Sequence, residues 1–128
     1  MDIRRPRVHF LHGEEMFNGL TYTAFLNNLA RSYVRKEVFL IHDNAPYHDA
    51  PEVQAWMADH KHRFHLVPLP KYSPDLNAVE RIWHHVRVTA THNRYFPTKQ
   101  EFVRTLDGAL RDIAVNPHQI GGYLQPFL

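Results

Sequence analysis

The sequence contains no cysteine among its 128 residues. This absence excludes disulfides, thiolate metal sites and thiol nucleophiles together, and it favours a cytoplasmic protein. No stretch reaches the length of about 18 consecutive apolar residues that a membrane span requires, so we expect no membrane partner. The chain opens with Met1, Asp2 and the basic stretch RRPR, without an apolar core, so we expect no signal peptide.

Charge of one sign is not in large excess. The chain has 15 lysines and arginines against 13 aspartates and glutamates, a formal net charge of +2, and 11 histidines. A modest positive balance fits an anionic partner. The basic residues gather at the start of the chain, near its middle and after residue 80: Arg4, Arg5, Arg7, Arg31, Arg35, Lys36, Arg81, Arg87 and Arg94.

In its first third, the sequence predicts a strand followed by a helix. Residues 7–12 (RVHFLH) are typical of a short strand, and Gly13 with the Asn18-Gly19 pair indicates the turns after it. The apolar residues of the next segment recur with a helical period, which predicts an amphipathic helix over residues 22–34. The members of its apolar face are Tyr22, Phe25, Leu26, Leu29, Ala30 and Tyr33.

The middle of the chain predicts two strands joined by a helix. Val38–Ile41 is a continuous apolar run typical of a strand buried on both faces. Asp49 is expected to cap a helix that has Pro51 in its first turn. Phe64–Val67 predicts the next strand, which the prolines after it end.

Two further helices complete the prediction. One is expected from about Asp75 to Thr91, with Trp83 in the core. Thr98 and Glu101 have the spacing of a capping box that opens the last helix, and Asn116-Pro117 ends it. The resulting order β-α-β-α-β-α-α predicts an α/β fold with at least two parallel strands.

Two carboxylates occupy positions suited to divalent metal. Asp43 ends the strand at Val38–Ile41, and Glu80 lies early in the helix that begins near Asp75. Open α/β sheets place their sites at the carboxyl ends of parallel strands. Mg²⁺ and Mn²⁺ prefer carboxylate oxygens, and two such ions can promote phosphodiester chemistry. If the helix packs beside the strand, both carboxylates reach one site.

Each of these residues also has a structural explanation. Asp43-Asn44 is compatible with a strand-ending turn in which the side chains bond their own backbone. Glu80 is compatible with the third position of a capping box led by Asn77. His48 is compatible with an ordinary surface histidine.

The two segments HDNAPYH (residues 42–48) and LPKYSPDLNAVERIW (residues 69–83) together resemble the paired signature of DDE transposases. The resemblance is to the mariner-like superfamily and its bacterial insertion-sequence relatives, and its core covers residues 38–86. It implies a ribonuclease-H-like fold, with a mixed sheet flanked by helices and a C-terminal helical part at residues 98–128. By this resemblance Asp43 is the second acidic residue of the catalytic triad and Glu80 the third.

The resemblance also implies a function. Such proteins cut DNA at transposon ends and join it to a target by hydroxyl attack, using two Mg²⁺ or Mn²⁺ ions, and a bacterial member would be associated with the nucleoid. Asn44 and His48 match family positions and are expected to orient the site. Lys71, Tyr72 and Arg81 flank it and are expected to contact DNA phosphates.

The sequence departs from the family pattern upstream of Asp43. Asp2 is the only earlier aspartate, and it does not lie in an apolar run like that of the family's first aspartate. The N-terminal DNA-binding region of these transposases has no counterpart either. We therefore expect one partial catalytic domain over residues 1–128 that needs an N-terminal portion for activity. The open edge of Val38–Ile41 is expected to pair with residues 7–12, with another copy or with that N-terminal portion.

Two other functions fit the same residues. One is a complete metal-dependent nuclease that needs only Asp43, Glu80 and His48. The other is a non-enzymatic DNA-binding or dimerisation remnant, for which the basic residues matter and the carboxylates do not. A zinc site is disfavoured, because the neighbouring histidines 84 and 85 diverge on a helix and histidines 60 and 62 lack further ligands.

Overall fold

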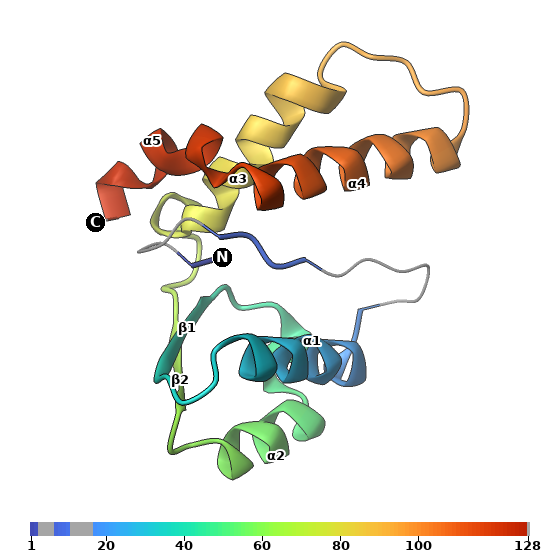
Figure 1. Ribbon diagram of the computed structural model, residues 1–128. Helices are drawn as coiled ribbons and strands as arrows, with labels where there is room; N and C mark the ends of the chain where they lie inside the picture. Colours follow the sequence, from blue (N-terminus) through green and yellow to red (C-terminus); the bar gives the residue numbers. More distant parts are fainter. Residues whose placement is uncertain (3–6, 11–16, 128) are drawn as a thin grey trace. The chain divides into compact units, whose positions relative to one another are not determined.

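The computed structural model describes residues 1–2, 7–10 and 17–127 (Figure 1). The chain forms two compact units: a sheet unit of residues 11–77 and a helical unit of residues 1–10 and 78–128. Each has a hydrophobic core of its own. The predicted α/β class is confirmed at the level of helices combined with a small parallel sheet. In the described part of the chain, no helix is both long and apolar enough to cross a membrane.

The sheet unit is built around two parallel strands, β1 (Val38–His42) and β2 (Phe64–Pro68). Their register pairs Val38 with Phe64 and His42 with Pro68. Parallel strands need a crossover connection, and here it contains helix α2 (Pro51–Asp59). Helix α1 (Gly19–Ser32) precedes β1. The two predicted strands in the middle of the chain are therefore confirmed.

Helices α1 and α2 cover one face of this sheet (Figure 1). The predicted apolar face of α1 is confirmed, since Leu26 and Leu29 are buried against α2 and the strands. Trp56 Nε1 on α2 donates a 2.8 Å hydrogen bond to Asn27 Oδ1, which links the two helices. The buried residues of this core are Leu26, Leu29, Val53, Trp56 and Phe64.

The opposite face of the sheet is open, which contradicts the prediction that Val38–Ile41 is buried on both sides. Phe39 is 62% exposed and Ile41 is 51% exposed. Successive side chains of a strand point to opposite faces, so Val38 and Leu40 turn toward the helices while Phe39 and Ile41 turn away. An apolar run by itself does not indicate whether helices cover one face of a strand or both, and among the described residues they cover one.

Residues Asn18 and Gly19 begin α1 rather than a turn. Asn18 Oδ1 accepts a 3.1 Å hydrogen bond from the Thr21 N–H, and Thr21 Oγ1 accepts a 2.8 Å bond from the Asn18 N–H. This reciprocal capping satisfies backbone donors at the start of the helix. Gly19 is required by close packing, because a Cβ atom there would lie 2.6 Å from the Ala50 Cβ.

The prediction that Asp49 caps α2 is wrong. Asp49 is the last residue of a short 3₁₀ helix, η1 (Pro46–Asp49), and Ala50 occupies the N-cap position without a side-chain bond. Pro51 does lie in the first turn, as predicted. Proline is favoured there because it has no N–H to satisfy, and the Val53 N–H donates a 3.0 Å hydrogen bond to the Ala50 carbonyl oxygen.

The helical unit contains α3 (Ala78–Val86), α4 (Lys99–Val115) and α5 (Gly121–Leu124). The single helix predicted from Asp75 to Thr91 is divided into the 3₁₀ turn η2 (Pro74–Leu76), α3 and a π-helical turn η3 (Arg87–Thr91). The predicted start of α4 is confirmed, since Thr98 Oγ1 accepts a 3.2 Å hydrogen bond from the Glu101 N–H. The predicted end is confirmed too, with Asn116 as the C-cap.

The core of the helical unit is formed by α3, α4 and the 3₁₀ helix η4 (Pro117–Ile120). Its buried residues are Ile82, Val86, Leu110, Ile113 and Ile120. Trp83 was expected in the core but is 44% exposed. Ile82 and Val86 are four positions apart and share the buried stripe, whereas Trp83 lies beside that stripe.

The strand predicted at residues 7–12 is not found over its described part. Residues 8–10 have no regular structure, and Arg7 forms an isolated antiparallel bridge with Asp2. Val8 and Phe10 pack against the core of the helical unit. Residues 11 and 12, Gly13, and the basic Arg4 and Arg5 lie outside the described residues.

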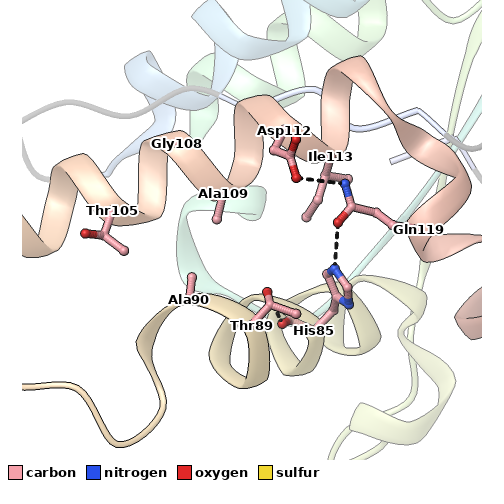
Figure 2. A pocket seen from close by; sticks show the side chains of 9 residues that line it. All are labelled: His85, Thr89, Ala90, Thr105, Gly108, Ala109, Asp112, Ile113 and Gln119. Carbon is pink, nitrogen blue, oxygen red and sulfur yellow. Dashed lines mark hydrogen bonds between the residues drawn. The ribbon is translucent and has the colours of Figure 1, made fainter.

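A cavity of about 270 Å³ opens within the helical unit between α3, η3, α4 and η4. Figure 2 shows Gln119 between His85 and Asp112 at one end of it. Gln119 Oε1 lies 3.0 Å from His85 Nε2, and Gln119 Nε2 donates a 3.3 Å bond to Asp112 Oδ2. The cavity is lined by His85, Thr89, Ala90, Thr105, Gly108, Ala109, Asp112, Ile113 and Gln119.

Two glycines should respond oppositely to a methyl group. Gly19→Ala should lower the free energy of unfolding by about 1–3 kcal/mol, because the new Cβ overlaps Ala50. Gly108→Ala should raise it by about 0.5–1 kcal/mol, because Gly108 is inside α4 and a Cβ there meets no atom within 4 Å. Urea unfolding followed by circular dichroism measures both. Equal effects of the two substitutions would contradict the described packing.

Candidate functional site

Asp43 follows the last residue of β1, at the carboxyl end of the parallel pair. Its side chain is 60% exposed. Asp43 Oδ1 accepts a 3.0 Å hydrogen bond from the Ala45 N–H, which closes a strand-ending turn. Among the described residues this is the only hydrogen bond of the carboxylate, so Oδ2 remains available to a ligand.

Asn44 ties this turn to the neighbouring strand. Its Nδ2 donates a 3.1 Å hydrogen bond to the carbonyl oxygen of Leu69, the residue that follows β2. The N–H of Leu69 in turn donates a 2.9 Å bond to the carbonyl oxygen of His42. The ends of both strands are thereby joined on either side of Asp43, and Asn44 holds the turn in place.

His48 is not a surface residue. It lies in η1 and is only 7% exposed. Its Nδ1 lies 3.0 Å from the carbonyl oxygen of Asp43 and 3.6 Å from the Asp43 Oδ1. Burial lowers the pKa of His48, and nearby His42 also lowers it, while the hydrogen bond to the Asp43 backbone and the charges of Asp43 and Asp49 oppose that shift.

Aromatic rings enclose His48. The ring centroids of Tyr22 and Tyr47 lie 4.7 and 4.5 Å from that of His48. Burial raises the pKa of Tyr22 to about 12, with smaller contributions from Tyr47 and Asp43. The sequence indicated Tyr22 only as a member of an apolar helix face, and nothing in its spacing pointed to the site.

His42 is a site residue that the sequence interpretation missed. Its ring centroid lies 4.2 Å from that of His48, and its Nδ1 lies 2.8 Å from the carbonyl oxygen of Asp43. The alternation of side chains along the strand indicates the position of His42. It is two residues after Leu40 and four after Val38, on the face that the helices cover. A histidine on that face at the end of a strand must be near the loop that follows.

Lys71 and Tyr72 lie in the segment after β2, and both are exposed. Tyr72 is 99% exposed and has a φ of 56°, in the left-handed region that bulky residues rarely adopt. Ser73 Oγ donates a 3.2 Å hydrogen bond to the Lys71 carbonyl oxygen, which helps to fix the turn. Two adjacent residues, a cation and an aromatic ring, are thus both exposed to solvent.

Glu80 and Arg81 belong to the helical unit, in the first turns of α3. Both are exposed, because Ile82 and Val86 occupy the buried side of the helix. A carboxylate in the first turn interacts favourably with the helix dipole, which gives Glu80 a structural contribution as well. Among the described residues, the side-chain carboxylate of Glu80 makes no hydrogen bond or ion pair, so its oxygens are available.

The donor set suits a hard divalent cation. Asp43 and Glu80 each present exposed carboxylate oxygens, the type of ligand that Mg²⁺ and Mn²⁺ prefer. Over the described ranges, no cluster of three or more histidine, aspartate or glutamate side chains forms a metal site by itself. Each of these two carboxylates is therefore chemically suited to bind such an ion.

Tyr22 should make the sheet unit sensitive to alkali. A phenol whose pKa is raised by folding favours the folded state below its ordinary pKa near 10, and this advantage is lost as the pH rises toward 12. The urea midpoint of the native chain should therefore fall more steeply between about pH 10 and 12 than that of Tyr22→Phe. Parallel pH profiles of the two proteins would contradict the burial of this hydroxyl.

Comparison with known proteins connects these positions to a family. A family model described as DDE superfamily endonuclease matches residues 4–103. An insertion element IS630 uncharacterized 39 kDa protein of Shigella sonnei is 36% identical over 73 residues, which are 56% of this chain and 21% of that protein. The transposable element Tcb2 transposase of Caenorhabditis briggsae is 28% identical over 98 residues, 73% of this chain and 35% of that protein.

The chain spans from about a fifth to about a third of the length of these curated relatives. The family match covers most of this chain and includes both Asp43 and Glu80. It confirms the resemblance on which the sequence interpretation depended. The chain therefore belongs to the DDE superfamily endonucleases, and it is similar to an insertion-element protein and to a transposable-element transposase.

Proposed function

We propose that this chain is part of the metal-dependent catalytic domain of a DDE transposase, with a ribonuclease-H-like fold and with DNA as its substrate. The observation that carries the proposal is the exposed carboxylate of Asp43 in a braced turn at the carboxyl end of a parallel strand. Asp43 is the second acidic residue of the catalytic set and Glu80 the third. The reaction is cleavage at transposon ends and transfer of the cut strand to a target, at the chromosome in the cytoplasm.

Asp43 and Glu80 would hold Mg²⁺ or Mn²⁺ between them. The chemistry that such ions supply when bound is activation of the attacking oxygen and stabilisation of the leaving oxygen. Asp43 contributes Oδ2, because Oδ1 is held by the Ala45 N–H. Glu80 contributes an exposed carboxylate from the first turn of α3.

The remaining predicted residues have supporting parts in this proposal. Asn44 and His48 orient Asp43, one through the Leu69 carbonyl and the other through the Asp43 carbonyl. Lys71, Tyr72 and Arg81 contact the DNA backbone, as their exposure allows. Contacts of this kind fix the position of DNA and contribute no sequence preference.

The proposed first acidic residue comes from a segment outside residues 1–128. Asp2 is the sole aspartate before Asp43, and it is in an isolated bridge with Arg7 rather than in a strand. In the described part of the chain, β1 pairs with β2 on one side only. The open edge of β1 receives the strand that carries the first aspartate, from an N-terminal portion or another copy. Little DNA cleavage is therefore expected from this chain alone.

A metal titration tests the shared site. Asp43→Asn and Glu80→Gln should each weaken Mn²⁺ binding by about tenfold or more, measured by electron paramagnetic resonance of free Mn²⁺. If both carboxylates hold one ion, the double substitution should lower the Mn²⁺ affinity little more than either single one. The effects of substituting two residues that share a ligand are not additive. Asp59→Asn and Glu101→Gln, which change exposed carboxylates elsewhere in each unit, should leave binding unchanged.

Additive losses would contradict a shared site, and unchanged binding in both variants would contradict the metal centre.

The same proteins should be incubated with supercoiled plasmid and Mn²⁺. Cleavage by the native chain that Asp43→Asn abolishes would favour a complete small nuclease instead. Salt-sensitive DNA binding without metal binding would favour a non-enzymatic remnant.

DNA contacts should appear in the salt dependence of binding. Lys71→Gln and Arg81→Gln should each reduce the slope of log K against log salt by about 0.9, as one phosphate contact is lost. Lys99→Gln removes an exposed cation at the start of α4 and is the matched control. Fluorescence anisotropy with a short duplex gives the slopes. A slope that Lys99→Gln alters as much as Lys71→Gln would show that only overall charge matters.

A further inference from the structure

One backbone oxygen at the candidate site is contacted by two histidines. Nδ1 of His42 lies 2.8 Å from the carbonyl oxygen of Asp43, and Nδ1 of His48 lies 3.0 Å from the same atom. A carbonyl oxygen only accepts hydrogen bonds, and it has two lone pairs. Both contacts are therefore hydrogen bonds only if each Nδ1 carries a proton and donates it.

This requirement determines the tautomer of both rings. A neutral imidazole has one N–H, so an Nδ1–H leaves Nε2 as a bare acceptor. His42 Nε2 is buried, and within the described part of the chain it has no hydrogen-bond partner. A proton on that atom would be a buried donor without an acceptor, which costs more than a bare lone pair in a weakly polar site. The surroundings of Nε2 and the contact of Nδ1 thus favour the same tautomer.

The two rings also restrain each other. Their centroids are 4.2 Å apart and their planes cross at 68°, an edge-to-face arrangement. His42 is held by the last position of β1, and His48 by η1. The first and last residues of the segment HDNAPYH therefore contact the same atom, the carbonyl oxygen of Asp43.

We propose that His42 positions Asp43 as His48 does. Both rings are Nδ1–H tautomers that donate hydrogen bonds to the carbonyl oxygen of Asp43. With that carbonyl directed at the rings, the Asp43 peptide cannot rotate freely, and the carboxylate is kept on the exposed side. The effect on metal binding rests on the proposed function. The tautomers and the restrained peptide do not.

Amide side chains distinguish donation from packing. The amide nitrogen of asparagine lies at about the place of histidine Nδ1, whereas that of glutamine reaches the place of Nε2. His42→Asn therefore retains the donor to the Asp43 carbonyl and loses most of the ring. His42→Gln retains an amide but places it beyond that oxygen, and His42→Ala removes donor and ring together.

The first measurement uses the native chain and needs no metal. Long-range ¹H–¹⁵N correlation spectra at about pH 8, above the ordinary histidine pKa, report which ring nitrogen carries the proton. We expect His42 and His48 to be Nδ1–H tautomers, and His62, which is exposed, serves as the solvent reference. An Nε2–H tautomer at His42 would overturn the proposal.

The second measurement compares the His42 variants by hydrogen exchange and by Mn²⁺ titration. His42→Ala and His42→Gln should speed exchange of the Ala45 amide by about tenfold, because the turn that it closes with Asp43 Oδ1 opens more often. They should also weaken Mn²⁺ binding by about tenfold. His42→Asn should restore both values to within about twofold of the native protein, and His62→Asn should change neither.

The outcomes separate the two proposals. If the native chain binds no Mn²⁺, the proposed metal centre fails, while the tautomers and the Ala45 exchange rates still test the role of His42. If the native chain binds Mn²⁺ and His42→Ala binds it equally well with unchanged Ala45 exchange, the positioning role is overturned. If His42→Asn is as impaired as His42→Ala, the ring acts by packing and not by donation, which also overturns it.

Discussion

Parallel pairing of β1 with β2 is the constraint on which the candidate site depends. In a parallel pair both carboxyl ends lie at the same edge, so the residues that follow the two strands become neighbours. Asp43 and Asn44 follow β1, and Leu69 follows β2. The hydrogen bond from Asn44 to the Leu69 carbonyl and that from the Leu69 N–H to the His42 carbonyl are direct consequences. An antiparallel pair would have placed these residues at opposite ends.

In the described part of the chain, helices pack against one face of the two parallel strands and not against the other. Leu26 of α1 and Val53 of the crossover helix α2 are buried together with Phe64 of β2. Each such side chain contributes about 1.5–3 kcal/mol relative to exposure. That face also receives His42, so the packing that stabilises the sheet directs this ring toward the end of the strand. Stability and site geometry therefore depend on the same alternation of side chains.

Local signals predicted most of the elements. The spacing of apolar residues along α1 and the side-chain cap at Thr98 involve neighbours within four positions, and both were confirmed. Errors arose where distant segments decide the outcome. Whether Phe39 or Trp83 is buried depends on what covers it, and an apolar residue looks the same in either case. The burial of His48 depends on Tyr22, which is far away in the sequence.

In the candidate site too, residues with a local signal could be predicted, and those whose role depends on distant segments could not. Asp43 was recognised because its motif is local, whereas His42 was missed because its role appears only when η1 returns to the end of β1.

The structural and functional explanations of Asp43 are compatible with each other. Oδ1 closes the turn with Ala45, and Oδ2 remains available on the exposed side. A carboxylate whose first oxygen is fixed by the backbone presents its second in a defined direction, which is what a metal ligand needs. The turn at Asp43 is thus a requirement for ligation rather than evidence against it.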